Sequence, residues 1–177
     1  MSLLCELKYT TTDDQPITPY IMEYKTSTFE NGAGVIGLSS SQTYLPSGAF
    51  ESCASLKTIE LPTRITEIGS QAFVYCSSLE SAVLGDRTQI ISSEAFYECT
   101  SLKSITIPES VYNIGYAAFY KCSALEEITC LVDQPLSISG STFDGVNKAI
   151  PLYVPAISLD SYESAYSWDV FTNMIPI

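Results

Sequence analysis

Thiols and carboxylates are the side chains of this chain that could react, because its 177 residues include six cysteines and 20 Asp and Glu but no histidine. A serine or cysteine nucleophile is ordinarily activated by an adjacent base such as histidine. The composition therefore excludes Ser-His-Asp triads, Cys-His dyads and every metal site that contains histidine. The chemistry that remains would come from thiols or from paired carboxylates.

The cysteines recur at a fixed interval. Cys53, Cys76, Cys99 and Cys122 are 23 residues apart, and each follows an Ala-Phe pair and precedes a leucine at constant distances. A period between about 20 and 50 residues is the signature of stacked supersecondary units. We therefore expect a solenoid, whose extended surface favours binding over catalysis because it usually has no deep pocket.

One repeat, residues 72–94, shows how a coil is built. Ala72, Phe73, Cys76 and Leu79 have the spacing of one helical face, which predicts a short helix or helical turn. After the leucine of each repeat, apolar residues alternate with polar ones, as in a short strand with one buried side. The strand pairs are Ile59 and Leu61, Ile105 and Ile107, Ile128 and Cys130, and further apolar pairs follow at Ile65 and Ile68, Val111 and Ile114. Each coil is thus predicted to contain a strand, a corner and a helical return.

Stacked coils would place the repeat cysteines in one column. Neighbouring strands lie about 4.8 Å apart, which is within the Cα separation that a disulfide accepts, so oxidation is geometrically conceivable. Thiols that point the same way into a packed layer behave as small hydrophobes, however, and a single-file column lacks the convergent ligands that a metal needs. We expect buried free thiols, with Cys5 and Cys130 also in the core. No cofactor is expected, and no tight calcium site, because the chain has no D-x-D-x-D-G loop.

The repeat unit resembles a known family. The pattern A-F-x-x-C-x-x-L-x-x-I-x-[IL]-P, present at residues 49–62 and 95–108, is similar to the BspA-like class of leucine-rich repeats. The segment 150–155, followed by Tyr162 and residues 167–173, resembles the segment that closes such arrays. The repeat at Ala72 departs from the pattern with Gly85 in place of proline, and the repeat at Ala118 loses its second apolar pair at residues 134–137.

This resemblance implies a fold and a setting. The fold class is an α+β repeat, a right-handed leucine-rich-repeat solenoid with 23-residue coils, an N-terminal hairpin cap and a C-terminal helical and aromatic cap. Families of this kind are associated with bacterial cell-surface proteins that contact host matrix or other cells. The resemblance therefore implies a secreted or surface-displayed bacterial protein, although residues 1–12 lack the layout of a signal peptide.

We expect one structural domain in three parts: an N-terminal cap at 1–34, repeats at 35–141 with one degenerate and four clear coils, and a C-terminal cap at 142–177. The degenerate coil is read from Ile36, Leu38 and Leu45, which precede Ile59, Leu61 and Ile68 by 23 residues. A solenoid must cover its terminal coils, because open edges would pair with other chains.

Both caps have a predicted structure. At the N-terminus, the alternation of Cys5, Leu7 and Tyr9 and a second strand at 20–24 predict a hairpin lid. At the C-terminus, Ser158 is predicted to cap a helix. The aromatic and apolar residues expected to seal the last coil are Leu159, Tyr162, Ala165 and Tyr166 on one helical face, then Trp168 and Phe171.

Charged residues in one register should form a ladder. Lys57, Glu80, Lys103 and Glu126 are 23 residues apart and alternate in sign, so they would lie side by side on successive strands. Opposite charges on neighbouring strands attract, whereas slippage of one coil would bring like charges together. We hypothesise that this ladder fixes the stacking of the coils.

Two surfaces are candidates for binding. The outward strand positions are Thr58, Glu60, Ser81, Val83, Ser104, Thr106, Glu127 and Thr129. This small, hydroxyl-rich row suits a protein segment or a glycan better than a small molecule, but an ordinary solvated sheet face explains its composition nearly as well. The alternative surface is a tyrosine stripe on the helical side, formed by Tyr75, Tyr97 and Tyr120, which could mark an interface.

Charge and geometry limit the remaining functions. The net charge of -12 disfavours nucleic acid and anionic membrane surfaces, and no apolar run is long enough for a spanning helix. Glu60 and Glu127 would lie three coils apart, about 14 Å, which is wider than the carboxylate separation of glycosidases. We therefore expect no enzyme. The leading hypothesis is an adhesin-like module that binds other proteins, such as host extracellular matrix, or glycans; the alternative is a structural spacer without a ligand.

Overall fold

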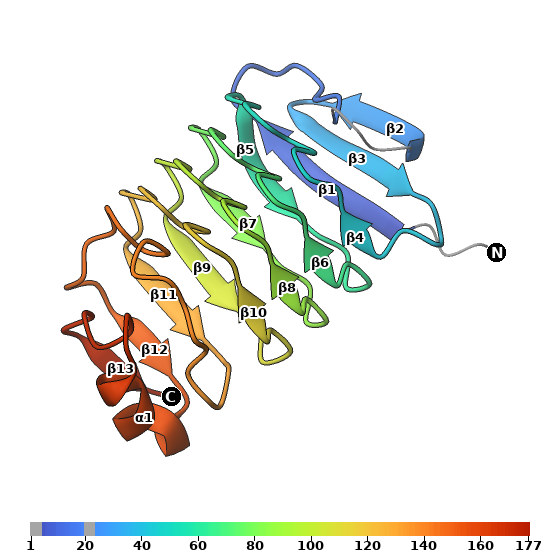
Figure 1. Cartoon of the computed structure of the whole chain (residues 1–177). Helices are drawn as coiled ribbons and strands as arrows, with labels where there is room; N and C mark the ends of the chain where they lie inside the picture. Colours follow the sequence, from blue (N-terminus) through green and yellow to red (C-terminus); the bar gives the residue numbers. More distant parts are fainter. Residues whose placement is uncertain (1–4, 20–23) are drawn as a thin grey trace.

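The computed structural model describes residues 5–19 and 24–177, which form a solenoid of about six turns with coils of about 23 residues (Figure 1). The strands are β1 (Cys5–Thr11), β2 (Tyr24–Glu30), β3 (Ala33–Leu38), β4 (Tyr44–Leu45), β5 (Leu56–Glu60), β6 (Glu67–Ile68), β7 (Ser81–Val83), β8 (Ile90–Ile91), β9 (Ser104–Ile107), β10 (Asn113–Ile114), β11 (Glu127–Cys130), β12 (Leu152–Val154) and β13 (Met174–Pro176). A 3-10 turn, η1 (Ala156–Ser158), leads into the short helix α1 (Leu159–Ser164).

The strands form two sheets that run along the solenoid as two rows (Figure 1). The nine-stranded sheet has the order β13-β12-β11-β9-β7-β5-β1-β3-β2, and the four-stranded sheet has the order β10-β8-β6-β4. From β5 to β13, neighbouring strands are parallel, and equivalent residues of successive coils pair with each other, as Ile105 does with Ile128. The strands of the first sheet pair residues exactly 23 apart between residues 56 and 130, and those of the second sheet do so between residues 44 and 114.

The segment that returns from one strand row to the next consists of turns. The sequence predicted a short helix or a helical turn there, and the structure has no helix in these segments of the described repeats. Tyr75, Glu98 and Lys121 have φ of 60°, 55° and 55°, whereas an α-helix requires φ near −63°. The backbone N–H groups then alternate between two partners. Cys76 N donates to Phe73 O within its own coil at 3.1 Å, and Phe73 N donates to Ala95 O of the next coil at 2.8 Å.

A ladder of phenylalanine rings fills the centre of the solenoid. Phe50, Phe73, Phe96, Phe119 and Phe143 stack in sequence, with ring centroids 5.3, 5.0, 5.4 and 5.3 Å apart. Offset-stacked rings at this separation contribute beyond the area that they bury. The ladder extends the predicted Ala-Phe column by one ring, because Phe143 takes the same place although Thr142 replaces the alanine.

The cysteine column lies beside the phenylalanine ladder, as free thiols. Cys76, Cys99 and Cys122 are buried, and each donates its S–H group to the carbonyl oxygen of the phenylalanine in the preceding coil, at 3.0 to 3.2 Å. Cys53 is partly exposed, and Cys130 is buried near the Tyr162 hydroxyl. Burial raises the pKa of all five thiols. The side chain of Cys5 lies outside the described residues.

The N-terminal end differs from the predicted hairpin. β2 and β3 form a hairpin across Asn31 and Gly32, whose φ values of 52° and 75° are those of an Asn-Gly turn. β1 pairs antiparallel with β3 on one side and with β5 on the other. The expected strand at 20–24 falls mostly on residues 20–23, outside the described residues, and β2 starts at Tyr24 and pairs with β3 instead of β1.

The strand expected to begin the degenerate first coil, at Ile36 and Leu38, does not lie beside β5 as the repeat predicts. Ile36 and Leu38 are buried as predicted, but they belong to the antiparallel β3, and β1 lies between β3 and β5. Leu45 in β4 does occupy the expected position, paired in parallel with Ile68 of β6. Residues 5–38 thus close the first sheet, while the second sheet begins with a regular coil.

The C-terminal end continues the first sheet through β12 and β13, and α1 packs at the end of the stack (Figure 1). Tyr162, Trp168 and Phe171 are buried, as expected for residues that seal the last coil. The prediction was wrong for Tyr166, which is 79% exposed because the helix ends before it, at Ser164. Ser158 precedes the helix but does not cap it, since its hydroxyl donates to Asp133 O.

Candidate functional site

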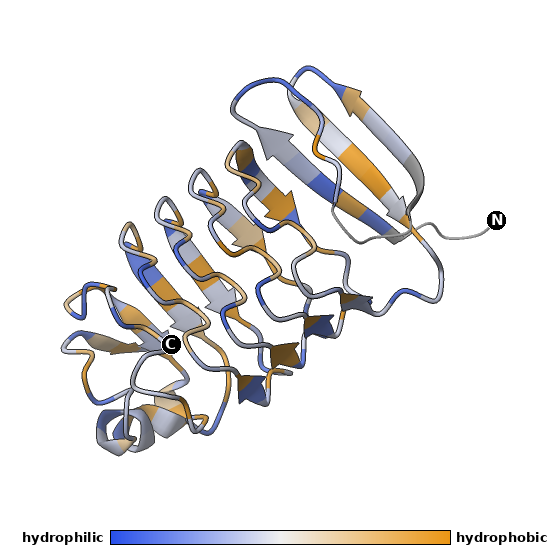
Figure 2. Ribbon diagram, turned by 45° about the horizontal axis from the view of Figure 1, so that its top comes forward, coloured by the Kyte–Doolittle hydropathy of each residue, from blue (hydrophilic) through white to orange (hydrophobic). Residues whose placement is uncertain are grey.

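The strand face is the outward side of β5, β7, β9 and β11. The predicted residues on it, all at least partly exposed, are Thr58, Glu60, Ser81, Val83, Ser104, Thr106, Glu127 and Thr129. Thr58 pairs with Ser81, Ser81 with Ser104, and Ser104 with Glu127, so one column crosses all four strands. Strand geometry explains the placement, because side chains alternate between the two sides of a sheet; the resulting alternation of hydropathy is visible along the strands in Figure 2.

Two hollows on this face join into one trough. A hollow of about 350 Å³ extends over β3, β1, β5 and β7, and a second of about 300 Å³ extends over β7 and β9. Both are lined by Ser81 and Val83, so we name the combined feature the strand-face trough. It brings together six of the predicted residues, Thr58, Glu60, Ser81, Val83, Ser104 and Thr106. Glu127 and Thr129 lie on β11, beyond the residues that line either hollow.

The N-terminal strands contribute part of the trough that sequence reasoning missed. Lys8 and Thr10 of β1 and Ala33 and Val35 of β3 line it together with the repeat residues. The Thr10 and Thr58 hydroxyls are 2.6 Å apart, and Lys8 Nζ lies 3.6 Å from the Glu60 carboxylate. The alternation of Lys8 and Thr10 with buried Leu7 and Tyr9 does place them on an outward face, but nothing in the sequence shows that β1 lies beside β5.

The lining of the trough combines hydroxyl groups with exposed apolar side chains. Val83 is 53% exposed and lies where the two hollows meet. The same hollows are lined by the hydroxyl groups of Thr10, Thr58, Ser81, Ser104 and Thr106, each of which can donate or accept a hydrogen bond. Such a surface is suited to an extended polypeptide, which presents alternating polar and apolar groups along its length.

The tyrosine stripe is a compact cluster on the turn side. Tyr97 and Tyr120 stack with ring centroids 4.7 Å apart, and Tyr75 meets Tyr97 edge-on at 5.7 Å. Lys121 Nζ lies 5.2 Å from the centre of the Tyr120 ring and 2.9 Å from the Glu98 carboxylate. The rings cover part of one another, and Tyr75, which is 48% exposed, is the one that presents most of its surface.

The charge ladder is present for three of its members. Glu80 lies between Lys57 and Lys103, with nitrogen-oxygen distances of 3.9 and 2.6 Å. The hydrogen bond from Lys103 lowers the pKa of the Glu80 carboxyl, and Glu80 in turn raises the pKa of Lys103. Glu126 also raises the pKa of Lys103 through its charge, but no ion pair of Glu126 occurs in the described part of the chain.

The two carboxylates considered for a glycosidase pair lie on separate strands. Glu60 and Glu127 lie on β5 and β11, with β7 and β9 between them. Within residues 5–19 and 24–177, no group of three or more Cys, Asp and Glu is placed to hold a metal ion. Among the same residues, no helix has the length and the apolar character needed to cross a membrane.

The stacked coils, the two sheets and the leucine column define a leucine-rich-repeat solenoid, a fold that is typically a non-enzymatic scaffold. A family model described as "BspA type Leucine rich repeat region (6 copies)" matches residues 24–150, and the chain belongs to this family. A search of curated proteins gave no match.

Two solved bacterial structures have a similar fold. A leucine-rich cell surface protein from Faecalibacterium prausnitzii is 26% identical, with a TM-score of 0.59 over 79% of this chain and 35% of its own. The pneumococcal vaccine antigen PcpA is 21% identical, with a TM-score of 0.57 over 75% of this chain and 39% of its own. The chain therefore spans little more than a third of the length of either protein.

Proposed function

We propose that this chain is a non-enzymatic, protein-binding module of a secreted or cell-surface bacterial protein, and that it binds through the strand-face trough. Leucine-rich-repeat proteins generally bind other proteins, and the F. prausnitzii relative is described as a cell surface protein. The observation that carries the proposal is the trough itself, where an exposed valine lies among hydroxyl groups from successive strands. The partner is a protein of the host, such as an extracellular-matrix component, or of a neighbouring cell.

The test is a binding screen of residues 1–177 against immobilised collagen, laminin and fibronectin. The variant Val83→Arg places a long charged side chain where the two hollows of the trough meet. Its matched control is Asn113→Arg, which adds the same charge at an exposed strand position on the second sheet. We expect saturable binding that Val83→Arg weakens at least tenfold and that Asn113→Arg leaves unchanged.

A triple substitution tests the polar side chains of the trough separately. Thr58, Glu60 and Thr106 flank Val83 on neighbouring strands, and their replacement by alanine removes hydrogen-bonding groups without adding bulk. Binding that survives both this variant and Val83→Arg would reject the trough and transfer the site to the tyrosine cluster or to a cap. The absence of binding to any protein would instead favour a structural spacer in a larger surface assembly.

A further inference from the structure

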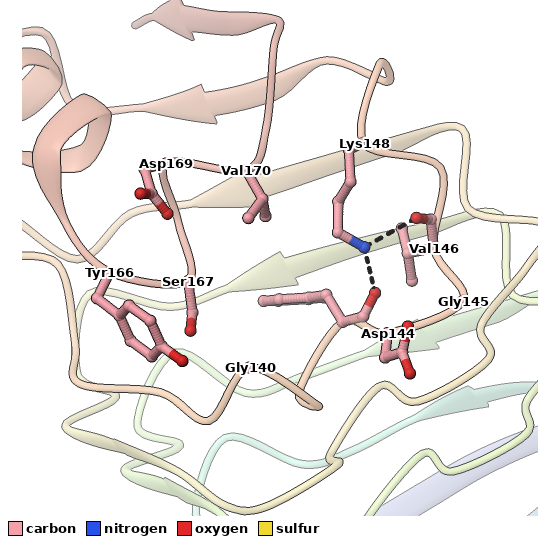
Figure 3. A pocket seen from close by; sticks show the side chains of 10 residues that line it. Gly140, Asp144, Gly145, Val146, Lys148, Tyr166, Ser167, Asp169 and Val170 are labelled. Atoms are coloured by element: carbon pink, nitrogen blue, oxygen red, sulfur yellow. Dashed lines mark hydrogen bonds between the residues drawn. The ribbon is translucent and has the colours of Figure 1, made fainter.

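A separate hollow of about 540 Å³ is formed by residues of the C-terminal part of the chain and shares no lining residue with the strand-face trough (Figure 3). It is an open hollow lined by residues of the loop 140–148 and of the segment 166–170, which follows α1. Its volume falls within the range of about 300–1,000 Å³ that is usual for small-ligand sites. The protein-binding proposal makes no use of this hollow.

Lys148 forms one wall of the hollow and is held in place from several sides. Its ammonium group donates to the carbonyl oxygens of Phe143 and Val146 and lies 5.5 Å from the centre of the Phe171 ring. Partial burial lowers the pKa of Lys148, which the negative charge of Asp144 partly offsets. An ammonium group has three donors, so one remains after the two carbonyl bonds.

Ser167 on the opposite side is a buried hydroxyl without a partner. Ser167 is only 8% exposed, and its Oγ makes no hydrogen bond within the described residues. Its φ of 69° is an unusual conformation for a residue other than glycine. A buried hydroxyl that lacks a hydrogen bond is unfavourable. Other atoms of the protein cover Ser167 Oγ, so Ser167 contributes to the wall of the hollow and is not an open hydrogen-bonding group.

Gly140 leaves room next to this hydroxyl. In Figure 3 the side chains of Tyr166 and Ser167 lie together on the Gly140 side of the hollow. A Cβ atom at position 140 would lie 3.5 Å from the Tyr166 hydroxyl and 3.9 Å from Ser167 Oγ. These are ordinary contact distances, so alanine would fit here and would occupy the space beside both hydroxyls.

The charges around the hollow argue against an anionic ligand. The exposed carboxylates of Asp144 and Asp169 outnumber the single ammonium group of Lys148, so the lining has a net negative charge that repels an anion. Carboxylates accept hydrogen bonds and the ammonium donates them, so a neutral molecule with several hydroxyl groups satisfies both. The ring of Tyr166, 79% exposed, adds a flat apolar surface against which the C–H face of a sugar can pack.

We propose that this hollow binds a neutral saccharide residue, such as the terminal sugar of a glycan. Asp144 and Asp169 accept bonds from its hydroxyl groups, Lys148 donates a bond to it, and Tyr166 packs against its apolar face. The site is independent of the strand-face trough, so one chain carries a protein-binding surface and a sugar-binding end.

The experiment is ligand-observed NMR of residues 1–177 with neutral methyl glycosides of glucose, galactose, mannose and N-acetylglucosamine. Anionic N-acetylneuraminic acid serves as the charged counterpart. We expect weak, saturable binding of at least one neutral glycoside and at least tenfold weaker binding of the anionic sugar. The absence of saturable binding by every neutral glycoside, or equally strong binding of the anionic sugar, would overturn the proposal.

Variants locate the site. Gly140→Ala and Tyr166→Ala should each weaken glycoside binding at least tenfold while the circular dichroism spectrum stays native. Tyr116→Ala is the matched control, because Tyr116 is also an exposed tyrosine, at 60%, but does not line the hollow. Glycoside binding should also survive Val83→Arg, which separates this test from that of the trough. Binding that persists in both Gly140→Ala and Tyr166→Ala, or that is lost in Val83→Arg, would reject the hollow as the site.

Discussion

Single side chains of the repeat act through columns, because each one packs against its equivalents in the coils before and after. Phe96 has no exposed surface and stacks on Phe73 and Phe119. Cys99 belongs to the cysteine column and donates its S–H group to Phe73 O of the preceding coil. A change at one column position therefore affects at least two interfaces between coils.

Phe96→Ala should lower the free energy of unfolding by about 3–5 kcal/mol, because it leaves a cavity in the middle of the ring ladder. Urea unfolding followed by far-UV circular dichroism measures the change. Tyr112→Ala removes a ring that is 61% exposed, so it should cost no more than about 0.5 kcal/mol. Similar losses in the two variants would contradict the stacking role of the ladder.

The buried thiols should make stability fall at high pH. Burial raises the pKa of Cys76, Cys99 and Cys122 in the folded protein, so these thiols stay protonated at a pH where the unfolded chain ionises them. The unfolded state then binds fewer protons, and the free energy of unfolding falls by about 1.4 kcal/mol per thiol for each pH unit above the ordinary thiol pKa of about 8.5. Below that pH these thiols add no pH dependence.

This pH dependence is measured by urea unfolding between pH 7 and pH 10 under reducing conditions. The comparison is with a variant in which Cys76, Cys99 and Cys122 are alanine. Its absolute stability will be lower because of the cavities, but its decline above pH 8.5 should be shallower. Equal slopes in the two proteins would show that the thiols do not cause the decline.

The strands of the repeats are stabilised by hydrogen bonds between coils, and the turns are stabilised both within their own coil and by the next one. β5, β7, β9 and β11 are short and pair with their neighbours in parallel register, and the turns on the return side also bond to the next coil. The Glu80 carboxylate lies between Lys57 and Lys103 on the neighbouring strands. We expect this ladder of charges to reinforce the register of the stack.

Lys103→Glu should lower the melting temperature, because it replaces the 2.6 Å ion pair with Glu80 by repulsion from both Glu80 and Glu126. The difference from the unmodified protein should shrink at 1 M salt, where exposed charges are screened. Arg87→Glu makes the same change of charge at a residue without an ion pair in the described part of the chain, and it should have a smaller effect. A melting curve that is unchanged by Lys103→Glu would reject a role for the ladder in stacking.

At the scale of the whole molecule, the two ends are sealed in different ways. The antiparallel strands β1, β2 and β3 close the first sheet at the N-terminal end, and aromatic residues cover the last coil at the C-terminal end. The ring ladder reaches this second cap, since Phe143 contacts both Trp168 and Phe171 with centroid distances of 5.6 and 5.5 Å. Core and cap are thus continuous.

This continuity predicts that the C-terminal cap and the coils unfold together. Trp168 is the sole tryptophan, is fully buried and donates its indole N–H to Leu136 O at 2.8 Å, so its fluorescence reports on the cap alone. Its urea transition should coincide with that of far-UV circular dichroism, which reports on all coils. A fluorescence transition at lower urea would show that the cap separates before the stack, as nearest-neighbour coupling permits in repeat proteins.

The repeat could be predicted from the sequence because each coil buries the same set of residues. The Ala-Phe, cysteine and leucine columns of residues 49–125 have a constant interval, which indicates stacking before any contact is known. The outward strand positions follow from the same period, since a strand with one buried side must expose the other. That logic placed Thr58, Ser81 and Ser104 correctly on the strand face.

Only the tertiary structure decided where the pattern stops and what joins it. β1 lies between β3 and β5, so Thr10 meets Thr58 across 48 residues of sequence, and no periodic signal records such a contact. The Asn-Gly turn at 31–32 was the local signal for the β2–β3 hairpin, but it does not specify the neighbour of that hairpin. Tyr166 and Ser167 likewise meet Gly140 through folding of the cap. Periodicity determines the buried face of each coil, whereas the trough and the terminal hollow arise where non-repeating segments pack against the stack.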